Sequence, residues 1–134
     1  MSKYVERAKE LRASTEKHYS CAAAVFIPFA EEKGFDTETA RMISQNFGGG
    51  ARSGSNCGGT FGGIMAIGLY GLIEPADAME FYKRFRERHD NLLTCPQLLK
   101  ASAERGEEKK AHCDGLVYEC VGIVEEILKE HNLL

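Results

Sequence analysis

The sequence predicts an all-α fold of about six to seven helices around a buried, glycine-rich central helix. Apolar residues recur at helical spacing along most of the chain, and capping residues precede several of these segments. No alternating apolar run is long enough to form a strand. With 134 residues, the chain has the size of a single compact domain, residues 1–134, with a self-sufficient core.

The expected helices follow from apolar periodicity and from residues that start or end a helix. Tyr4, Ala8 and Leu11 share one face of the first helix, and Ser20 is a candidate N-cap of the second. One long helix, kinked near Pro28, is an alternative to these two. Helices are expected over residues 3–14, 21–33, 37–47, 58–73, 75–90, 95–103 and 113–130.

A glycine-rich stretch occupies the middle of the chain. Eight of the fourteen glycines lie between Gly48 and Gly63, and residues 48–56 are expected to form a loop. Residues 58–73 carry no charge and have apolar side chains all round, which indicates a buried central helix. The uncharged run over residues 53–73 reaches the length of a membrane span, but it contains many glycines. A membrane span is therefore not expected.

The charge and the N-terminus exclude several classes of function. Seventeen Lys and Arg against twenty Asp and Glu give a net charge of −3, so no basic excess is present to bind nucleic acid. The first residues contain no apolar signal segment, which predicts a cytoplasmic protein. In the reducing cytosol, thiols serve as ligands or redox groups more often than as structural disulfides. No catalytic carboxylate pair, serine triad, nicotinamide site or flavin site is recognisable.

Cysteines are the candidate functional residues. Four of the five, Cys21, Cys57, Cys95 and Cys113, lie at or near expected helix N-termini. There the helix dipole and free backbone N–H groups lower the pKa of a thiol, and the resulting thiolate binds metal or attacks a disulfide. The alternative is that these residues fill the core, which is the expected role of Cys120. No Cys-x-x-Cys pair occurs, which argues against a zinc ribbon and a thioredoxin-like site.

Glycines beside Cys57 leave a smooth face on the central helix. Gly58, Gly59 and Gly62 are the positions where a cofactor, or another helix, is expected to approach the backbone closely. The preceding loop resembles an anion cradle to which Arg52 adds charge, although it matches no nucleotide-binding motif.

Two histidines lie near cysteines in the chain. His18 precedes Cys21 by three residues and His112 is adjacent to Cys113, so each is a candidate ligand or proton donor. Each is also close to charged residues, which favours an exposed position instead.

The order of these motifs resembles a known family. The matching elements are Cys21-Ala-x-Ala-Val, Phe47-Gly-Gly-Gly, Cys57-Gly-Gly-x-x-Gly, Cys95 with Leu98-Leu99, and Cys113. Together they resemble the C_GCAxxG_C_C family of redox-active proteins over about residues 8–127. The family's central label reads Gly-Cys-Ala-x-x-Gly, where this chain has Asn56-Cys57-Gly58-Gly59-Thr60-Phe61-Gly62.

This resemblance implies a small helical redox protein with Cys21, Cys57, Cys95 and Cys113 as its functional set. Cys120 lies outside the pattern. The family is also similar to the N-terminal part of split-Soret cytochromes, which implies an association with an iron–sulfur site.

Three functions are compatible with these residues. The first is an electron-transfer protein whose four cysteines bind an iron–sulfur cluster and exchange electrons with a redox partner protein or a small-molecule electron carrier. The second is a metal-free thiol–disulfide protein in which a thiolate such as Cys95 attacks. The third is a non-catalytic helical module, either a homodimer or a zinc-binding accessory domain.

Overall fold

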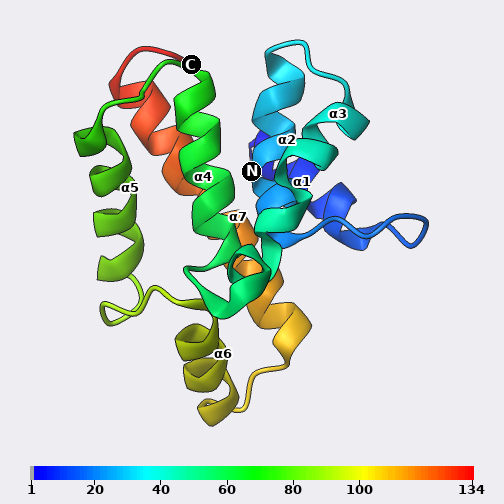
Figure 1. Ribbon diagram of the computed structural model, residues 1–134, viewed down its shortest axis with the longest axis vertical. Helices are drawn as coiled ribbons and strands as arrows, with labels where there is room; N and C mark the ends of the chain where they lie inside the picture. The colour runs from blue at the N-terminus through cyan, green and yellow to red at the C-terminus, as the bar shows by residue number, and fades with distance from the viewer. Residues whose placement is uncertain (1) are drawn as a thin grey trace.

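The computed structural model describes residues 2–134 and contains seven α-helices, with no β-strand among these residues (Figure 1). The prediction of an all-α fold is confirmed. The α-helices are α1 (Lys3–Ala13), α2 (Cys21–Glu32), α3 (Thr37–Ser44), α4 (Gly58–Leu69), α5 (Pro75–Glu87), α6 (Cys95–Glu104) and α7 (Lys109–Glu130). Two short turns, η1 (Gln45–Phe47) and η2 (Gly50–Gly54), connect α3 to the loop before α4.

The helix starts are defined by side-chain caps. Ser20 accepts a hydrogen bond from the backbone N–H of Ala23, and Asp36 accepts one from Thr39. Because Ser20 caps α2 and has extended backbone angles, the alternative of one long helix through residues 14–20 is wrong. Pro28 lies inside α2 without ending it.

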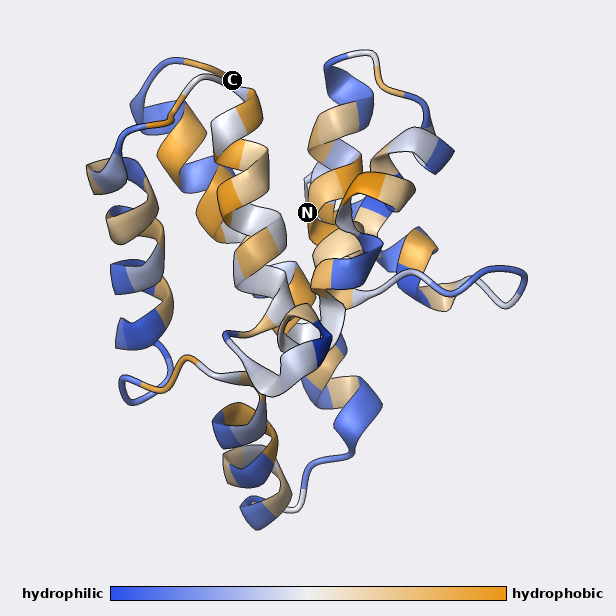
Figure 2. Ribbon diagram, in the orientation of Figure 1, coloured by the Kyte–Doolittle hydropathy of each residue, from blue (hydrophilic) through white to orange (hydrophobic). Residues whose placement is uncertain are grey.

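The core is formed by α2, α4 and α7, which pack against one another. Every residue of α2 from Ala22 to Ala30 is buried. Figure 2 shows hydrophobic residues concentrated on these three helices and hydrophilic ones on the outer helix α5. The expected central position of the glycine-rich helix is therefore confirmed, since α4 packs on α2, α5 and α7.

Glycines allow α4 to lie close to its neighbours. A Cβ atom at Gly62 would stand 2.4 Å from the carbonyl oxygen of Ala22 in α2, and one at Gly63 would stand 2.2 Å from the buried ring of Phe81 in α5. Both positions admit no side chain unless the neighbouring helix moves. This close approach brings the first turns of α2 and α4 together.

Four expected helix boundaries are wrong by three residues or more, and one of them is the end of the fifth helix, which lies at Glu87 and not at Asp90. The last helix begins at Lys109, not at Cys113, because Lys109, Lys110 and Ala111 are good helix formers despite their polarity. The third helix ends at Ser44 and continues only as a 3₁₀ turn, and the central helix ends at Leu69. As a result, Cys113 lies one turn inside α7.

None of the helices in the described part of the chain combines the length and the apolarity needed to cross a membrane.

Candidate functional site

One pocket of about 700 Å³ brings together residues from five α-helices, α1, α2, α4, α6 and α7. Its wall contains four of the five cysteines, namely Cys21, Cys57, Cys95 and Cys113. They come from the first residue of α2, the N-cap of α4, the first residue of α6 and the second turn of α7. The four cysteines singled out by the sequence thus line one cavity, although they are far apart in the chain. All five cysteines are free thiols.

Cys57 and Cys95 are held side by side by their backbones. Asn56 and Thr94 form an isolated antiparallel β-bridge. The N–H of Cys57 donates to the carbonyl oxygen of Leu93 at 2.8 Å, and the N–H of Cys95 donates to that of Ser55 at 2.8 Å. This bridge ties the N-terminus of α4 to the N-terminus of α6.

Cys21 and Cys113 both line this pocket, where α2 packs on α7. The interaction between the two sulfurs lowers the pKa of Cys113 to about 6. The positive charges of Arg12 and Lys109 lower it as well, while partial burial opposes them. The same interaction and burial raise the pKa of Cys21, so the pair carries one proton at neutral pH.

The other thiols lack this stabilisation. Burial raises the pKa of Cys57 to about 11, although the backbone N–H groups of Gly59 and Thr60 act in the opposite direction. Burial also raises the pKa of Cys95. The expectation that a helix N-terminus lowers the pKa of all four thiols is therefore wrong. The low pKa expected of Cys95 as an attacking thiolate is not found either, because burial raises the pKa of this thiol.

Arg12 and Lys109 are the site residues that the sequence did not indicate. Arg12 donates to the carboxylate of Asp114 at 2.7 Å and to the carbonyl oxygen of Tyr19 at 2.9 Å. These bonds fix its guanidinium between α1, α7 and the segment before α2. The amphipathic pattern of the first helix places Arg12 on the helix but does not distinguish it from other surface Lys and Arg residues.

The two histidines near the cysteines both line the pocket, but in different environments. His18 is exposed, as the charged residues near it suggested. The His112 side chain is only 5% exposed, and its Nδ1 lies 3.6 Å from the carboxylate of Glu107. Burial lowers the pKa of His112, so the imidazole is neutral at neutral pH.

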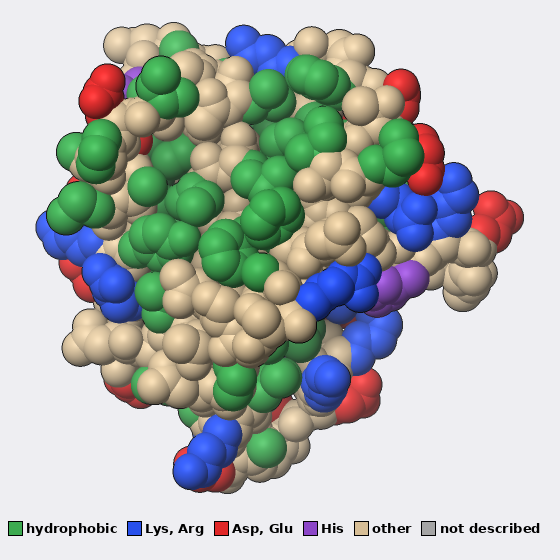
Figure 3. Space-filling view, in the orientation of Figure 1, with side chains coloured by type: hydrophobic (Ala, Val, Ile, Leu, Met, Phe, Trp, Pro, Cys, Tyr) green, Lys and Arg blue, Asp and Glu red, His purple; other side chains and the backbone are tan. Residues whose placement is uncertain are grey.

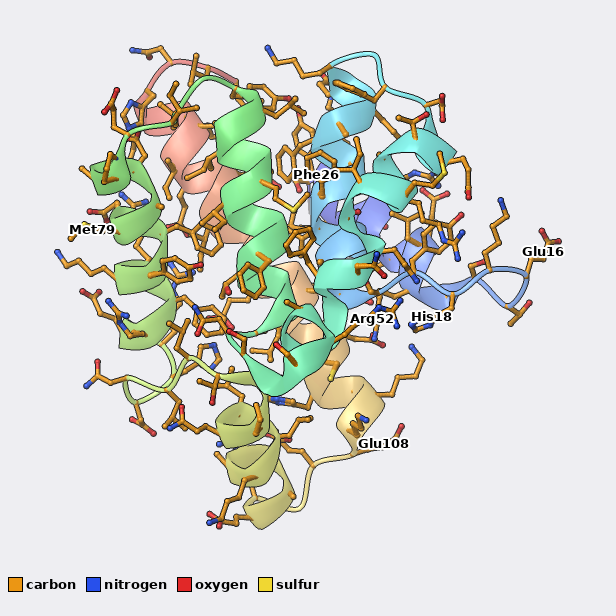
Figure 4. The ribbon with its side chains drawn as sticks, in the orientation of Figure 1. Glu16, His18, Phe26, Arg52, Met79 and Glu108 are labelled. Atoms are coloured by element: carbon orange, nitrogen blue, oxygen red, sulfur yellow. The ribbon has the colours of Figure 1, made fainter. Side chains whose placement is uncertain are left out.

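The loop before α4 makes a left-handed turn at the pocket. Four consecutive residues, Gly49 to Arg52, have φ angles between 56° and 65°. Gly50 needs this freedom because a Cβ atom there would stand 2.5 Å from the carbonyl oxygen of Ser55. Ala51 and Arg52 adopt the same conformation at a cost of about 1–2 kcal/mol each. The expected loop is thus a compact turn, which places Arg52 at the pocket (Figure 4).

Replacing Ala51 by glycine should stabilise the protein, because glycine adopts a positive φ without steric strain. We expect the free energy of unfolding to rise by about 0.5–1 kcal/mol, as the relief of strain exceeds the added chain entropy. Urea denaturation followed by circular dichroism measures this change. Ala78→Gly in the helical part of α5 is the matched control and should lower the same quantity by about 0.5–1 kcal/mol. A loss of stability in both variants would contradict the strained turn.

The three glycines proposed to face a cofactor have different surroundings. Gly58 lines the pocket. A Cβ atom at Gly59 would stand 3.0 Å from the Cys120 sulfur, and the space beside Gly62 is occupied by the backbone of α2. Cys120 itself is fully buried in the core face of α7, beneath Cys57. Contacts with neighbouring helices and with Cys120 thus account for Gly59 and Gly62.

The arrangement of ligands does not form a ready metal site. Among residues 2–134, no group of three or more His, Cys, Asp or Glu side chains lies close enough to hold a metal ion. The four pocket thiols line one wall without converging on one point in this conformation.

The comparison with known families agrees with this set of cysteines. Residues 19–127 match the family model described as "Putative redox-active protein (C_GCAxxG_C_C)". The chain belongs to this family. The matched range of the C_GCAxxG_C_C model includes every pocket cysteine, together with the glycine-rich turn and α4. No curated protein and no solved structure matches the chain.

Proposed function

We propose that this member of the C_GCAxxG_C_C family is a thiol–disulfide redox protein in which Cys113 is the attacking thiolate and Cys21 the resolving thiol. The observation that carries the proposal is that Cys21 and Cys113 line the same pocket and have opposite pKa shifts, raised at Cys21 and lowered at Cys113. A pKa of about 6 keeps Cys113 ionised at neutral pH and close to the optimum for an attacking thiol. Cys113 also lines a second, smaller pocket of about 310 Å³.

The reaction with a disulfide R–S–S–R follows from this pair. The Cys113 thiolate attacks one sulfur of the substrate, the substrate S–S bond breaks, and RS⁻ leaves with the bonding electrons. Cys21 then gives its proton to the departing RS⁻ and attacks the Cys113 sulfur of the mixed disulfide. A second RS⁻ leaves, and two electrons have passed from the protein to the substrate. The products are a Cys21–Cys113 disulfide, one RSH and one RS⁻.

An iron–sulfur cluster is the second candidate, because four thiols line one pocket. Thiolates are the usual ligands of such clusters, so the chemistry of the donor set is suitable. Their spacing is not, since no three potential ligands among the described residues are within reach of a common metal ion. Binding would require the N-termini of α2, α4, α6 and α7 to move together. A cluster bound there would supply one-electron transfer, which the dithiol pair does not.

The test uses protein purified without oxygen and begins with its iron and acid-labile sulfide content. The metal-free, reduced protein is then treated with one equivalent of a small disulfide, and the remaining thiols are counted and mapped by mass spectrometry. We expect a loss of two thiols and one disulfide joining Cys21 to Cys113. Cys113→Ser should abolish this reaction, whereas Cys120→Ser should retain it because Cys120 is buried in the core.

The two candidates give different results in this experiment. Iron and sulfide in equal amounts, lost on Cys57→Ser, would favour the cluster and overturn the dithiol proposal. A disulfide between other cysteines would overturn the assignment of the pair. Since the oxidised protein must be reduced again, the proposed function also requires a reductant, a thiol or a redox protein, and a reducing compartment such as the cytosol.

A further inference from the structure

Among the described Lys, Arg, Asp and Glu residues, only basic ones line the pocket. Arg12, Arg52 and Lys109 line it, together with two histidines, and no Asp or Glu is among the described residues of its wall. This is unexpected in a chain with twenty acidic and seventeen basic residues. Figure 3 shows Lys and Arg side chains beside a histidine on the corresponding part of the surface, where Figure 4 labels Arg52 and His18.

The three cations do not have the same role. Arg12 is paired with Asp114, and it acts with Lys109 on the Cys113 thiolate. The Arg52 guanidinium has only one side-chain partner, the amide oxygen of Asn46 at 2.9 Å, and no carboxylate partner in the described residues. The left-handed turn places this exposed residue at the pocket in spite of its strained backbone. Because the Arg52 guanidinium forms no ion pair with a described carboxylate and does not stabilise a thiolate, it is available to bind a ligand.

A second observation also indicates a ligand. The Nε2 atom of His112 is buried and has no hydrogen-bond partner among the described residues. The side chain is 5% exposed and belongs to the pocket wall. A buried polar atom without a partner costs about 1–3 kcal/mol, and a polar group of a bound molecule would offset this cost.

We propose that the pocket selects small, negatively charged disulfides, with Arg52 and Lys109 binding the substrate's carboxylates while Cys113 attacks its S–S bond. This inference rests on the proposed function and specifies its substrate class. A pocket of about 700 Å³ suits a small molecule, since ligand sites typically measure about 300–1,000 Å³. The Arg52 and Lys109 side chains in its wall attract an anionic substrate and raise the association rate. The bonds formed and broken are those given above for R–S–S–R, with a carboxylate on each R group.

The test compares three small disulfides that differ in charge. They are 3,3′-dithiodipropionate with two carboxylates, 2-hydroxyethyl disulfide without charge, and cystamine with two ammonium groups. Each is mixed with the reduced, metal-free protein, and the rate of the single oxidation step is measured, so no external reductant is needed. We expect the anionic disulfide to react about tenfold faster than the neutral one, and cystamine to react more slowly than both. The anionic preference should decrease as ionic strength rises.

Variants at Arg52 identify the source of the preference. Arg52→Glu should reduce the ratio of the rates with the anionic and the neutral disulfide about tenfold, and the rate with cystamine should rise. Arg52→Gly removes the charge and also suits the positive φ, so it provides the same test if the glutamate variant does not fold. Lys83→Glu changes the net charge equally at an exposed position of α5 outside the pocket and should leave the ratio unchanged.

Each outcome bears on one of the two proposals. Similar rates for the three disulfides would overturn the charge selection and leave the thiol–disulfide function intact. An anionic preference that persists in both Arg52 variants would overturn the role of Arg52. Failure of all three disulfides to oxidise the wild-type protein would overturn the proposed function itself.

Discussion

Cys21→Ala should move the ionisation of Cys113 to markedly higher pH. In the native protein, the deprotonated fraction of Cys113 rises with pH through about 6, because the interaction with Cys21 stabilises the thiolate. Alanine offers no donor, so the pKa of Cys113 should rise by more than about one unit toward the ordinary thiol value. At pH about 6, alkylation of Cys113 should slow by roughly tenfold, because fewer molecules carry the thiolate although each thiolate is more nucleophilic.

The pH profile of iodoacetamide labelling at Cys113, read from peptide masses, measures this shift. Cys21→Ser is the matched control, since its hydroxyl can still donate a hydrogen bond and should keep the midpoint nearer to the native value. Cys95 reports the background, because burial raises the pKa of that thiol and its labelling should begin only at higher pH. An unchanged midpoint in Cys21→Ala would show that Arg12 and Lys109 alone set the pKa of Cys113.

Gly62→Ala should destabilise the protein strongly for a substitution that adds a single methyl group. The new Cβ atom would stand 2.4 Å from the carbonyl oxygen of Ala22 and 3.0 Å from the Cβ of Val25. Both belong to the fully buried part of α2, so relief requires the two central helices to separate. Overpacking of this kind lowers the free energy of unfolding by about 2–3 kcal/mol.

The control for this variant lies in the same helix. A Cβ atom at Gly68 would meet no other atom within 4 Å, so Gly68→Ala should raise stability by about 0.5–1 kcal/mol through helix propensity alone. Urea denaturation of both variants gives the two changes, which should have opposite signs. If Gly62→Ala were neutral, the close contact between α4 and α2 would be contradicted.

The fold follows largely from local signals in the sequence. Ser20 was recognisable as a cap, and the uncharged segment after Gly58 was recognisable as a buried helix, because capping and burial act over a few residues. The start of α7 at Lys109 was missed because the first turn of this helix is mainly charged and polar. It therefore lacks the apolar periodicity that predicts a helix. The left-handed turn at Ala51 depends on tertiary contacts, and no local sequence pattern predicts a positive φ at this residue.

The candidate site was only partly predictable. The sequence indicated the four cysteines, but it could not indicate which of them is ionised. That property depends on Cys21 meeting Cys113 across two helices and on Arg12, which comes from a third helix. Burial, which dominates at Cys57, likewise emerges only when the helices pack. Helix position alone therefore gave the wrong sign for three of the four thiol pKa values.

The bridge between Asn56 and Thr94 closes the chain into a loop that leaves the pocket and returns to it. The segment between these two residues contains α4, the following turn and α5. Its two ends are held next to each other by the bridge. The spacing of Cys57 and Cys95 along the chain is therefore independent of their spacing in the pocket. Insertions in the exposed turn at Gly71, within this segment, can lengthen the chain without separating the two thiols, so the number of residues between these cysteines is free to vary.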